Sequence, residues 1–154
     1  MNQEHAPPLL DVRDLCKYFP IRSKGFFARQ VGVVKAVDAV SFTVRKGETI
    51  GIVGESGSGK TTCARTILRA LKPTGGAVLF YEKQQHPIDL STVESGELKR
   101  LRTKIQMIFQ DPYSSLNPRM TVGDIIGEPL LIHRIGTKSE RRDRVMQMLR
   151  KVGL

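Results

Sequence analysis

Residues 54–62 read Gly-Glu-Ser-Gly-Ser-Gly-Lys-Thr-Thr and fit the pattern G-x-x-x-x-G-K-[ST] without a mismatch. Glycines let the backbone fold into a tight concave loop whose N–H groups point inward, a geometry that binds phosphate oxygens. Lys60 would bring a compact positive charge to β- and γ-phosphates, and the Thr61 hydroxyl is a ligand for Mg²⁺. The stretch therefore predicts a phosphate-binding loop at the N-terminus of a helix, whose dipole also favours anions.

The segments beside the loop follow the order that such a loop requires. The apolar run 49–53 is typical of a buried strand. After the loop, apolar residues recur at helical spacing, namely Cys63, Ala64, Ile67, Leu68 and Leu71. Strand, loop and helix in this order favour a nucleotide site over a Gly/Ser-rich turn without a ligand.

Patterning predicts the remaining elements of an α/β chain. Strands are expected over 9–19, 31–44, 77–81 and 105–109, the second being one strand or two, and the last being buried. Pro20 is expected to end the first strand. Helices are expected within 91–102, over 121–133 with Thr121 as N-cap, and from Ser139 with Gly153 as C-cap. Val145, Met148, Leu149 and Val152 should share the apolar face of the last helix.

Composition excludes few classes of protein. The 154 residues suffice for one domain, and no apolar run approaches the roughly 18 residues of a membrane span. No signal-peptide pattern opens the chain, so a cytosolic location is expected. Cys16 and Cys63 lack metal-ligand spacing and are predicted to be buried thiols. The net charge of +10 is compatible with nucleic acid, anionic membrane or phosphate, but aromatic residues are not interleaved with the basic ones as in single-strand binders.

Several blocks together resemble the nucleotide-binding subunit of ATP-binding cassette (ABC) transporters, and within it the oligopeptide/dipeptide importer group. They are Val-Lys-Ala-Val-Asp-Ala-Val-Ser-Phe at 34–42, Lys-Gly-Glu-Thr at 46–49, the loop block at 51–62, and Met-Ile-Phe-Gln-Asp-Pro-Tyr-Ser-Ser-Leu-Asn-Pro-Arg-Met at 107–120. The last block is particular to that group. The resemblance runs from about Leu9 to the end of the chain.

The resemblance implies a P-loop NTPase (RecA-like) core with an N-terminal antiparallel β subdomain and the start of a helical subdomain. After a flexible tail at 1–8, the implied boundaries of this partial ABC ATP-binding domain are 9–48 for the β subdomain, 49–110 for the core and 111–154 for the helical subdomain.

The resemblance also assigns roles in binding ATP and Mg²⁺. Phe19 matches an aromatic that stacks on adenine, with Tyr18 as a neighbouring candidate and a core aromatic at a strand end as the alternative. Gln110 matches a glutamine that approaches Mg²⁺ and the attacking water. Lys60 and Gln110 would therefore be catalytic, and Thr61 and Gln110 metal ligands. The nucleotide would be held by Phe19 and by Gly54, Glu55, Ser56, Gly57, Ser58, Gly59, Lys60, Thr61 and Thr62.

The implied function is that of an ABC-type ATPase subunit that couples ATP binding and hydrolysis to peptide uptake. It would lie peripherally on the cytoplasmic face of the inner (cell) membrane. Its partners would be transmembrane permease subunits, a second ATPase subunit and, indirectly, a solute-binding protein, with no nucleic acid.

Alternatives stay open at this point. Nickel, glutathione or another solute is an alternative cargo, and the charge keeps a nucleic-acid-associated P-loop ATPase in view. A GTPase should carry Asn-Lys-x-Asp, which the chain lacks, and a small-molecule kinase should carry an Arg-rich lid, for which 138–151 is a loose fit.

The sequence departs from the family at its end. It stops at Leu154 without a Leu-Ser-Gly-Gly-Gln-type signature, an apolar strand ending in Asp-Glu, or a switch histidine. Asp11 and Asp89 follow no suitable apolar strand and do not replace the missing acids. We therefore expect a fragment or truncated product that binds nucleotide weakly, is not competent in hydrolysis alone, and is poorly soluble.

Overall fold

The computed structural model describes residues 8–23, 29–82, 86–111 and 116–154. The chain divides into two compact units, Met1–Leu98 and Lys99–Leu154. Of the tail predicted at 1–8, residues 1–7 lie outside the described residues, and Pro8 already belongs to the first strand.

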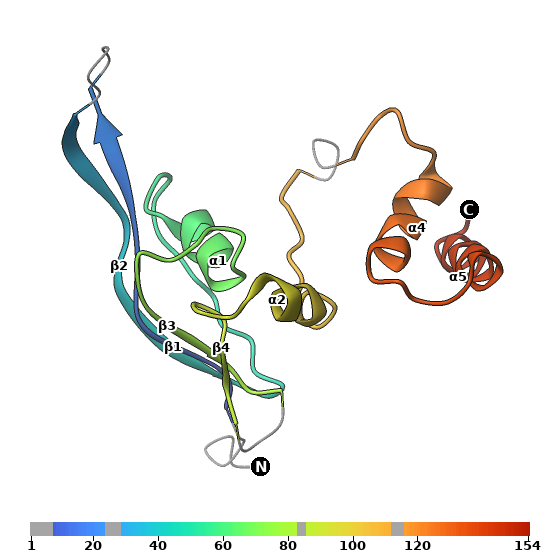
Figure 1. Cartoon of the computed structure of the whole chain (residues 1–154), viewed down its shortest axis with the longest axis horizontal. Coiled ribbons are helices and arrows are strands. Elements are labelled where there is room, and N and C mark those ends of the chain that lie inside the picture. The colour runs from blue at the N-terminus through green and yellow to red at the C-terminus, as the bar shows by residue number, and fades with distance from the viewer. Residues whose placement is uncertain (1–7, 24–28, 83–85, 112–115) are drawn as a thin grey trace. The chain divides into compact units, whose positions relative to one another are not determined.

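The first unit contains an antiparallel sheet of four strands: β1 (Pro8–Arg22), β2 (Gln30–Arg45), β3 (Gly75–Phe80) and β4 (Ile88–Asp89). Their order in the sheet is β2-β1-β3-β4, as Figure 1 shows. Val12 of β1 lies opposite Phe42 on one side and Val78 on the other, so the centre of the sheet is apolar. The predicted N-terminal antiparallel β subdomain is confirmed.

The first two strands are longer than predicted. Pro20 does not end β1, and 31–44 forms part of one strand with irregular register. The physical reason is that β3 pairs with β1 only from Leu10 to Cys16. Beyond that point β1 is an edge strand, where the missing N–H of proline leaves no ladder bond unmade.

The core of the first unit lies between the sheet and helix α1 (Lys60–Ile67), which contacts β1 and β2. Cys63, Thr66 and Ile67 of the helix are buried, together with the sheet residues Val12, Leu15, Val37, Val78 and Phe80. Cys63 is buried as predicted, but Cys16 is only partly buried. Cys16 lies opposite Gly75, where β3 begins, and its Sγ accepts a hydrogen bond from the Ala39 N–H at 3.3 Å instead of packing in the core.

Two predicted buried strands are wrong. Residues 49–53 in the first unit and 105–109 in the second form neither strand nor core, and the side chains of Val53 and Ile108 are 91% and 95% exposed. A strand buried on both faces needs neighbours in its own sheet and covering layers. The sheet of the described residues consists of β1 to β4, and none of them pairs with either run.

Helix α2 (Ser95–Leu101) includes the last residues of the first unit and the first of the second. The second unit also contains α4 (Val122–Ile132) and α5 (Lys138–Lys151). Thr121 caps α4 as predicted, because its hydroxyl accepts from the Asp124 N–H. The predicted cap Ser139 is wrong: α5 begins at N-cap Thr137, because only Thr137 has a glutamate, Glu140, three residues further on to close a capping box.

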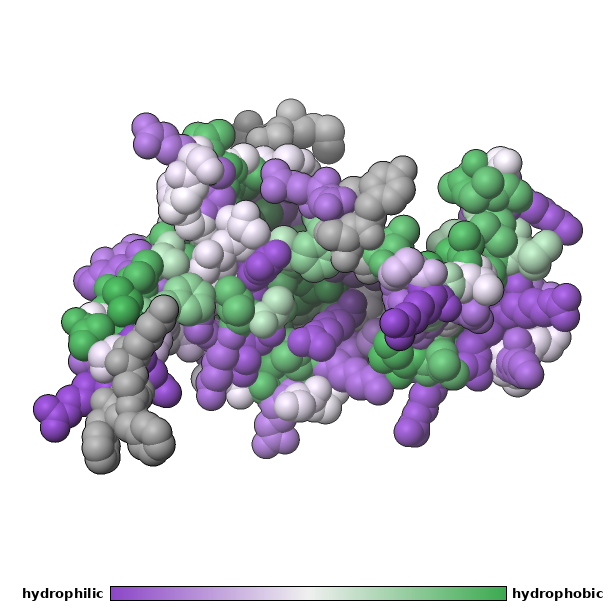
Figure 2. Space-filling view, turned by 90° about the horizontal axis from the view of Figure 1, so that it is seen from above, coloured by the Kyte–Doolittle hydropathy of each residue, from purple (hydrophilic) through white to green (hydrophobic). Residues whose placement is uncertain are grey.

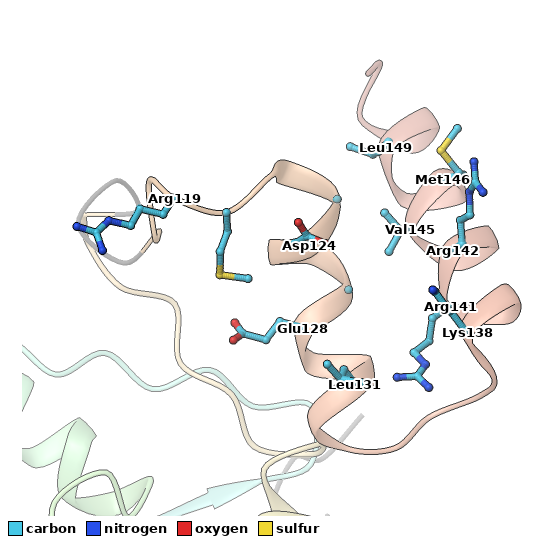
Figure 3. Close-up of a pocket in the computed structure, with 13 residues that line it drawn as sticks. Arg119, Asp124, Glu128, Leu131, Lys138, Arg141, Arg142, Val145, Met146 and Leu149 are labelled. Atoms are coloured by element: carbon cyan, nitrogen blue, oxygen red, sulfur yellow. The ribbon is translucent and has the colours of Figure 1, made fainter.

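Helices α4 and α5 lie side by side and touch through small residues (Figure 3). Val145 packs over Gly127, where an added Cβ would lie 3.5 Å from Val145 Cγ2. Of the predicted apolar face of α5, only Val145 is buried, while Met148 and Val152 are exposed. Gly153 follows the C-cap Val152 with φ 81°, as the predicted stop requires.

Hydrophobic side chains also lie at the surface among charged ones on the face shown in Figure 2. Within the described ranges, no helix combines the length and apolar character that crossing a membrane requires.

Candidate nucleotide site

The loop at 54–62 is closed by its own backbone. A turn at Ser56 and Gly57 brings the Ser58 N–H to the Glu55 carbonyl at 3.2 Å, and Gly57 has φ 81°. Gly59, with φ 95°, ends the loop and is the N-cap of α1. A Cβ on Gly59 would lie 2.1 Å from the Ala36 carbonyl oxygen, so the loop rests directly on the backbone of β2. Only glycine fits there, which accounts for the second glycine of the motif.

The N-terminus of α1 is left open for an anion. No side chain caps it, and its first turn contains no acidic residue. The first helical hydrogen bond runs from the Cys63 N–H to the Gly59 carbonyl at 2.8 Å. The N–H groups before Cys63 precede the first possible intrahelical bond, and the helix dipole adds to their positive potential. This end of α1 is therefore suited to phosphate.

Lys60 folds back over the loop. Its Nζ donates to the carbonyl oxygens of Gly54 at 2.7 Å and Glu55 at 2.6 Å, and lies 3.4 Å from Ser58 Oγ. These contacts hold the ammonium group at the loop, where it could donate hydrogen bonds to a bound phosphate.

A cavity of about 450 Å³ opens beside the loop. The loop, the segment before it and α1 contribute Ile52, Val53, Gly54, Ser58, Gly59, Lys60 and Cys63, and β2 contributes Lys35, Ala36, Val37, Asp38, Val40 and Phe42. The positive end of α1 and a neighbouring hollow thus lie together in the first unit, as a nucleotide requires.

The residues at the loop fit Mg²⁺ in a limited way. Thr61 is exposed at the start of α1. Among the described residues no group of three or more His, Cys, Asp or Glu could hold a metal. Mg²⁺ would therefore be held by Thr61 together with phosphate oxygens and water, which suits an ion that keeps several waters.

The two candidate aromatics lie next to each other on β1, where its register against β2 is irregular. Phe19 lies opposite Val34, and Lys17 Nζ is 4.8 Å from its ring centroid. Phe19 does not line the cavity described above, so its stacking on adenine stays a prediction.

Tyr18 is tied to residues that do line the cavity. Its hydroxyl donates to Asp38 Oδ1, and Lys35 Nζ lies 3.2 Å from Asp38 Oδ2 and 5.3 Å from the Tyr18 ring centroid. The hydrogen bond to Asp38, and then the one to Cys16, raises the pKa of Tyr18. The bond from Tyr18, and then the one from Lys35, lowers the pKa of Asp38.

The sequence alone did not reveal this Tyr18–Asp38–Lys35 cluster. Residues three apart in a regular strand point to opposite faces, so Lys35 and Asp38 would not be paired from their spacing. The irregular register of β1 against β2 and the left-handed φ of 51° at Ala39 depart from that regularity. A local irregularity of this kind leaves no clear signal in the residue types.

Gln110 is exposed and belongs to the second unit, whereas the loop belongs to the first. A joint site of Gln110 and the loop therefore stays a prediction. Tyr113, Ser114 and Ser115 of the block that follows Gln110 lie outside the described residues.

The second unit has a hollow of its own, of about 770 Å³, between α4 and α5. Figure 3 shows Asp124, Glu128 and Leu131 on α4, and Val145 on α5 pointing toward α4. Lys138, Arg141 and Arg142 of α5 also line it. It contains none of the residues predicted to bind nucleotide.

The loop and the uncapped start of α1 together have the arrangement of a phosphate-binding loop. The sequence pattern of one family, "ABC transporter", matches residues 37–154, and the chain belongs to that family.

Two relatives show the similarity in sequence. "Oligopeptide transport ATP-binding protein AppF" of Bacillus subtilis (strain 168) is 53% identical, over 100% of this chain and 45% of the relative. "Dipeptide transport ATP-binding protein DppF" of Escherichia coli (strain K12) is 46% identical, over 96% of this chain and 42% of the relative. The chain thus spans less than half the length of these relatives.

Two solved structures show the similarity in fold. The ATP-binding cassette MJ0796, a dimer in a post-hydrolysis state bound to ADP and Pi, superposes with a TM-score of 0.69 at 24% identity, over 92% of this chain and 56% of that one. The protein cbiO1 from Clostridium perfringens gives a TM-score of 0.61 at 26% identity, over 96% and 51%. The fold is a partial ABC cassette, with an antiparallel β subdomain and helices.

Proposed function

We propose that this chain is the ATP-binding part of an ABC importer subunit, which couples ATP binding and hydrolysis to the uptake of peptides. The observation that carries the proposal is the closed loop at 54–62, set at the uncapped N-terminus of α1 with Lys60 beside it. Peptides are proposed as cargo because AppF and DppF are named for oligopeptide and dipeptide transport.

Bound MgATP supplies the phosphoryl group whose transfer to water drives such transport. In this chain, the N–H groups at the start of α1 bind phosphate oxygens, and Lys60 exchanges its loop carbonyls for them. The Thr61 hydroxyl would hold Mg²⁺, and Phe19 would stack on the base. Gln110 would orient the attacking water and contribute an oxygen near Mg²⁺, as its match to the family implies.

The proposed partners are permease subunits and a second ATPase subunit, with a solute-binding protein acting indirectly and no nucleic acid. The proposed place is the cytoplasmic face of the cell membrane. The chain alone should bind nucleotide weakly and not turn it over, because the acidic residues that hold Mg²⁺ and activate water in the family have no match in it.

Titration calorimetry with MgATP tests the proposal. Wild-type chain should bind, and Lys60→Ala should lower the affinity by at least about tenfold, since a hydrogen bond to a charged group contributes about 1.5–3 kcal/mol. Lys46→Ala is the matched control, because Lys46 is an exposed lysine in the turn before the loop and should leave the affinity unchanged. Equal loss in both variants would point to general charge attraction and contradict the assignment of the loop.

A further inference from the structure

We propose that the Asp38 carboxylate binds the ribose hydroxyls of the nucleotide whose phosphates the loop holds. The inference rests on the proposed function and assigns a specificity-determining role to a residue outside the loop. Asp38 and Lys60 line the same cavity, from β2 and from α1 respectively.

The distance along β2 fits a nucleoside. Ala36 touches Gly59, the residue at which the loop becomes α1. Asp38 is two residues further along the strand, so the two positions are at most about 7 Å apart, the span of a fully extended chain. The β-phosphate and the ribose hydroxyls of a nucleoside triphosphate are separated by a similar span, whereas the purine amino group lies further away.

The carboxylate is held ready to accept hydrogen bonds. Tyr18 donates to Oδ1, and Lys35 Nζ lies 3.2 Å from Oδ2. A carboxylate has about four acceptor positions, so both oxygens keep capacity for a ligand. The lowered pKa of Asp38 keeps it ionised near neutral pH, and the raised pKa of Tyr18 keeps the phenol a donor.

Charge also favours an uncharged donor pair as the group that binds Asp38. Lys35 balances the charge of Asp38, so the pair does not repel the triphosphate at the other end of the cavity. A ribose diol presents two hydroxyl donors without charge, and an acidic residue accepting from ribose hydroxyls is a recurrent solution in nucleotide-binding proteins.

The test compares three ligands on the complete 154-residue chain: MgATP, 2′,3′-dideoxy-ATP with Mg²⁺, and inorganic tripolyphosphate with Mg²⁺. Calorimetry should show that wild-type chain prefers ATP to dideoxy-ATP by about tenfold, the value of a hydrogen bond to a charged group. Asp38→Asn loses the charge and one acceptor oxygen, so it should remove most of this preference and leave the affinity for tripolyphosphate unchanged. Tyr18→Phe removes only the orienting hydroxyl and should reduce the preference to an intermediate value.

The controls separate the possible failures. Asp143→Asn, an exposed acid on α5, should keep the full preference, and circular dichroism checks that each variant folds. Equal weakening of all three ligands by Asp38→Asn would show a structural role and overturn the inference. Equal affinity of wild-type chain for ATP and dideoxy-ATP would overturn the inference alone. If the wild-type chain bound none of the three ligands, the proposed function would fail with it.

Discussion

Gly59 decides where the loop can lie. Its φ of 95° is in the left-handed region, and the Ala36 carbonyl oxygen occupies the place of a side chain. Gly47 has a similar φ of 82° but open space around it, and Gly51 has neither restriction. Substitutions at these three glycines therefore distinguish the energetic cost of a left-handed backbone from the cost of a steric clash.

Alanine substitutions at the three glycines should differ in how much they lower the free energy of unfolding. Gly51→Ala should change the free energy of unfolding by less than about 0.5 kcal/mol. Gly47→Ala should cost about 1 kcal/mol from its left-handed backbone. Gly59→Ala should cost more than about 2 kcal/mol, because strain and a backbone clash add. Urea unfolding followed by circular dichroism measures the series, and equal losses at Gly47 and Gly59 would contradict the close contact with β2.

At the scale of elements, helix starts follow from a few neighbouring residues. The α5 helix begins at Thr137 because Glu140 accepts from the Thr137 N–H at 2.6 Å while Thr137 Oγ1 accepts from the Glu140 N–H. The Thr137 N–H, then the Thr137 hydroxyl and the charge of Arg144, lower the pKa of Glu140. The cap is therefore sensitive to pH.

The direction of the pH dependence follows from the lowered pKa of Glu140. Ionised Glu140 is favoured in the folded helix, so its stabilisation is present above the unfolded value of about 4.3 and is lost as pH falls through the lower folded value. Below pH 4, the first turn of α5 should lose hydrogen-exchange protection, measured as its rate relative to that of an unstructured chain at the same pH. Glu140→Gln keeps an oxygen acceptor but does not titrate, so its protection should lack this acid-induced loss. An identical acid response in both proteins would exclude the carboxylate as the cause.

Strands were predictable only where the information is local. Val40, Phe42 and Val44 alternate with polar residues, a pattern typical of a half-buried strand, and all three are half-buried in β2, since the pleat alone produces that pattern. The runs at 49–53 and 105–109 are also apolar but form no strand, because a buried strand depends on neighbours that no short window contains. The motif predicted the turn of the loop and the helix that follows it, whereas the contact of Asp38 with Tyr18 depends on an irregular pairing between β1 and β2 and was not predicted.

For the whole molecule, the prominent property is apolar side chains left in contact with water. Each unit has its own set: Val31, Ile52 and Val53 in the first, and Ile108, Leu131 and Met148 in the second. Exposed apolar side chains favour association with other surfaces where they form a patch. The poor solubility expected from the sequence stays a prediction, and these residues are the candidates for its cause.

Sedimentation velocity over a range of concentrations should show self-association of the wild-type chain. The double variant Val53→Ser and Ile108→Ser should stay monomeric to higher concentration with little change in stability, since both side chains are already exposed. Substituting the buried Val12 by serine is the opposite control, and should lower stability strongly. An unchanged association constant in the double variant would place the contact elsewhere.

The hydrogen bonds of Lys60 also bear on selectivity among anions. The ammonium group already donates to two carbonyl oxygens of the same loop. An entering anion has to replace these acceptors, which are part of the folded chain and lose no translational freedom when they bind. A weakly basic ion such as chloride gains little from that exchange, whereas a polyphosphate with several oxygens can replace all of those acceptors at once. The hydrogen bonds of the folded-back lysine therefore lower the affinity of the loop for small ions such as chloride more than its affinity for polyphosphates.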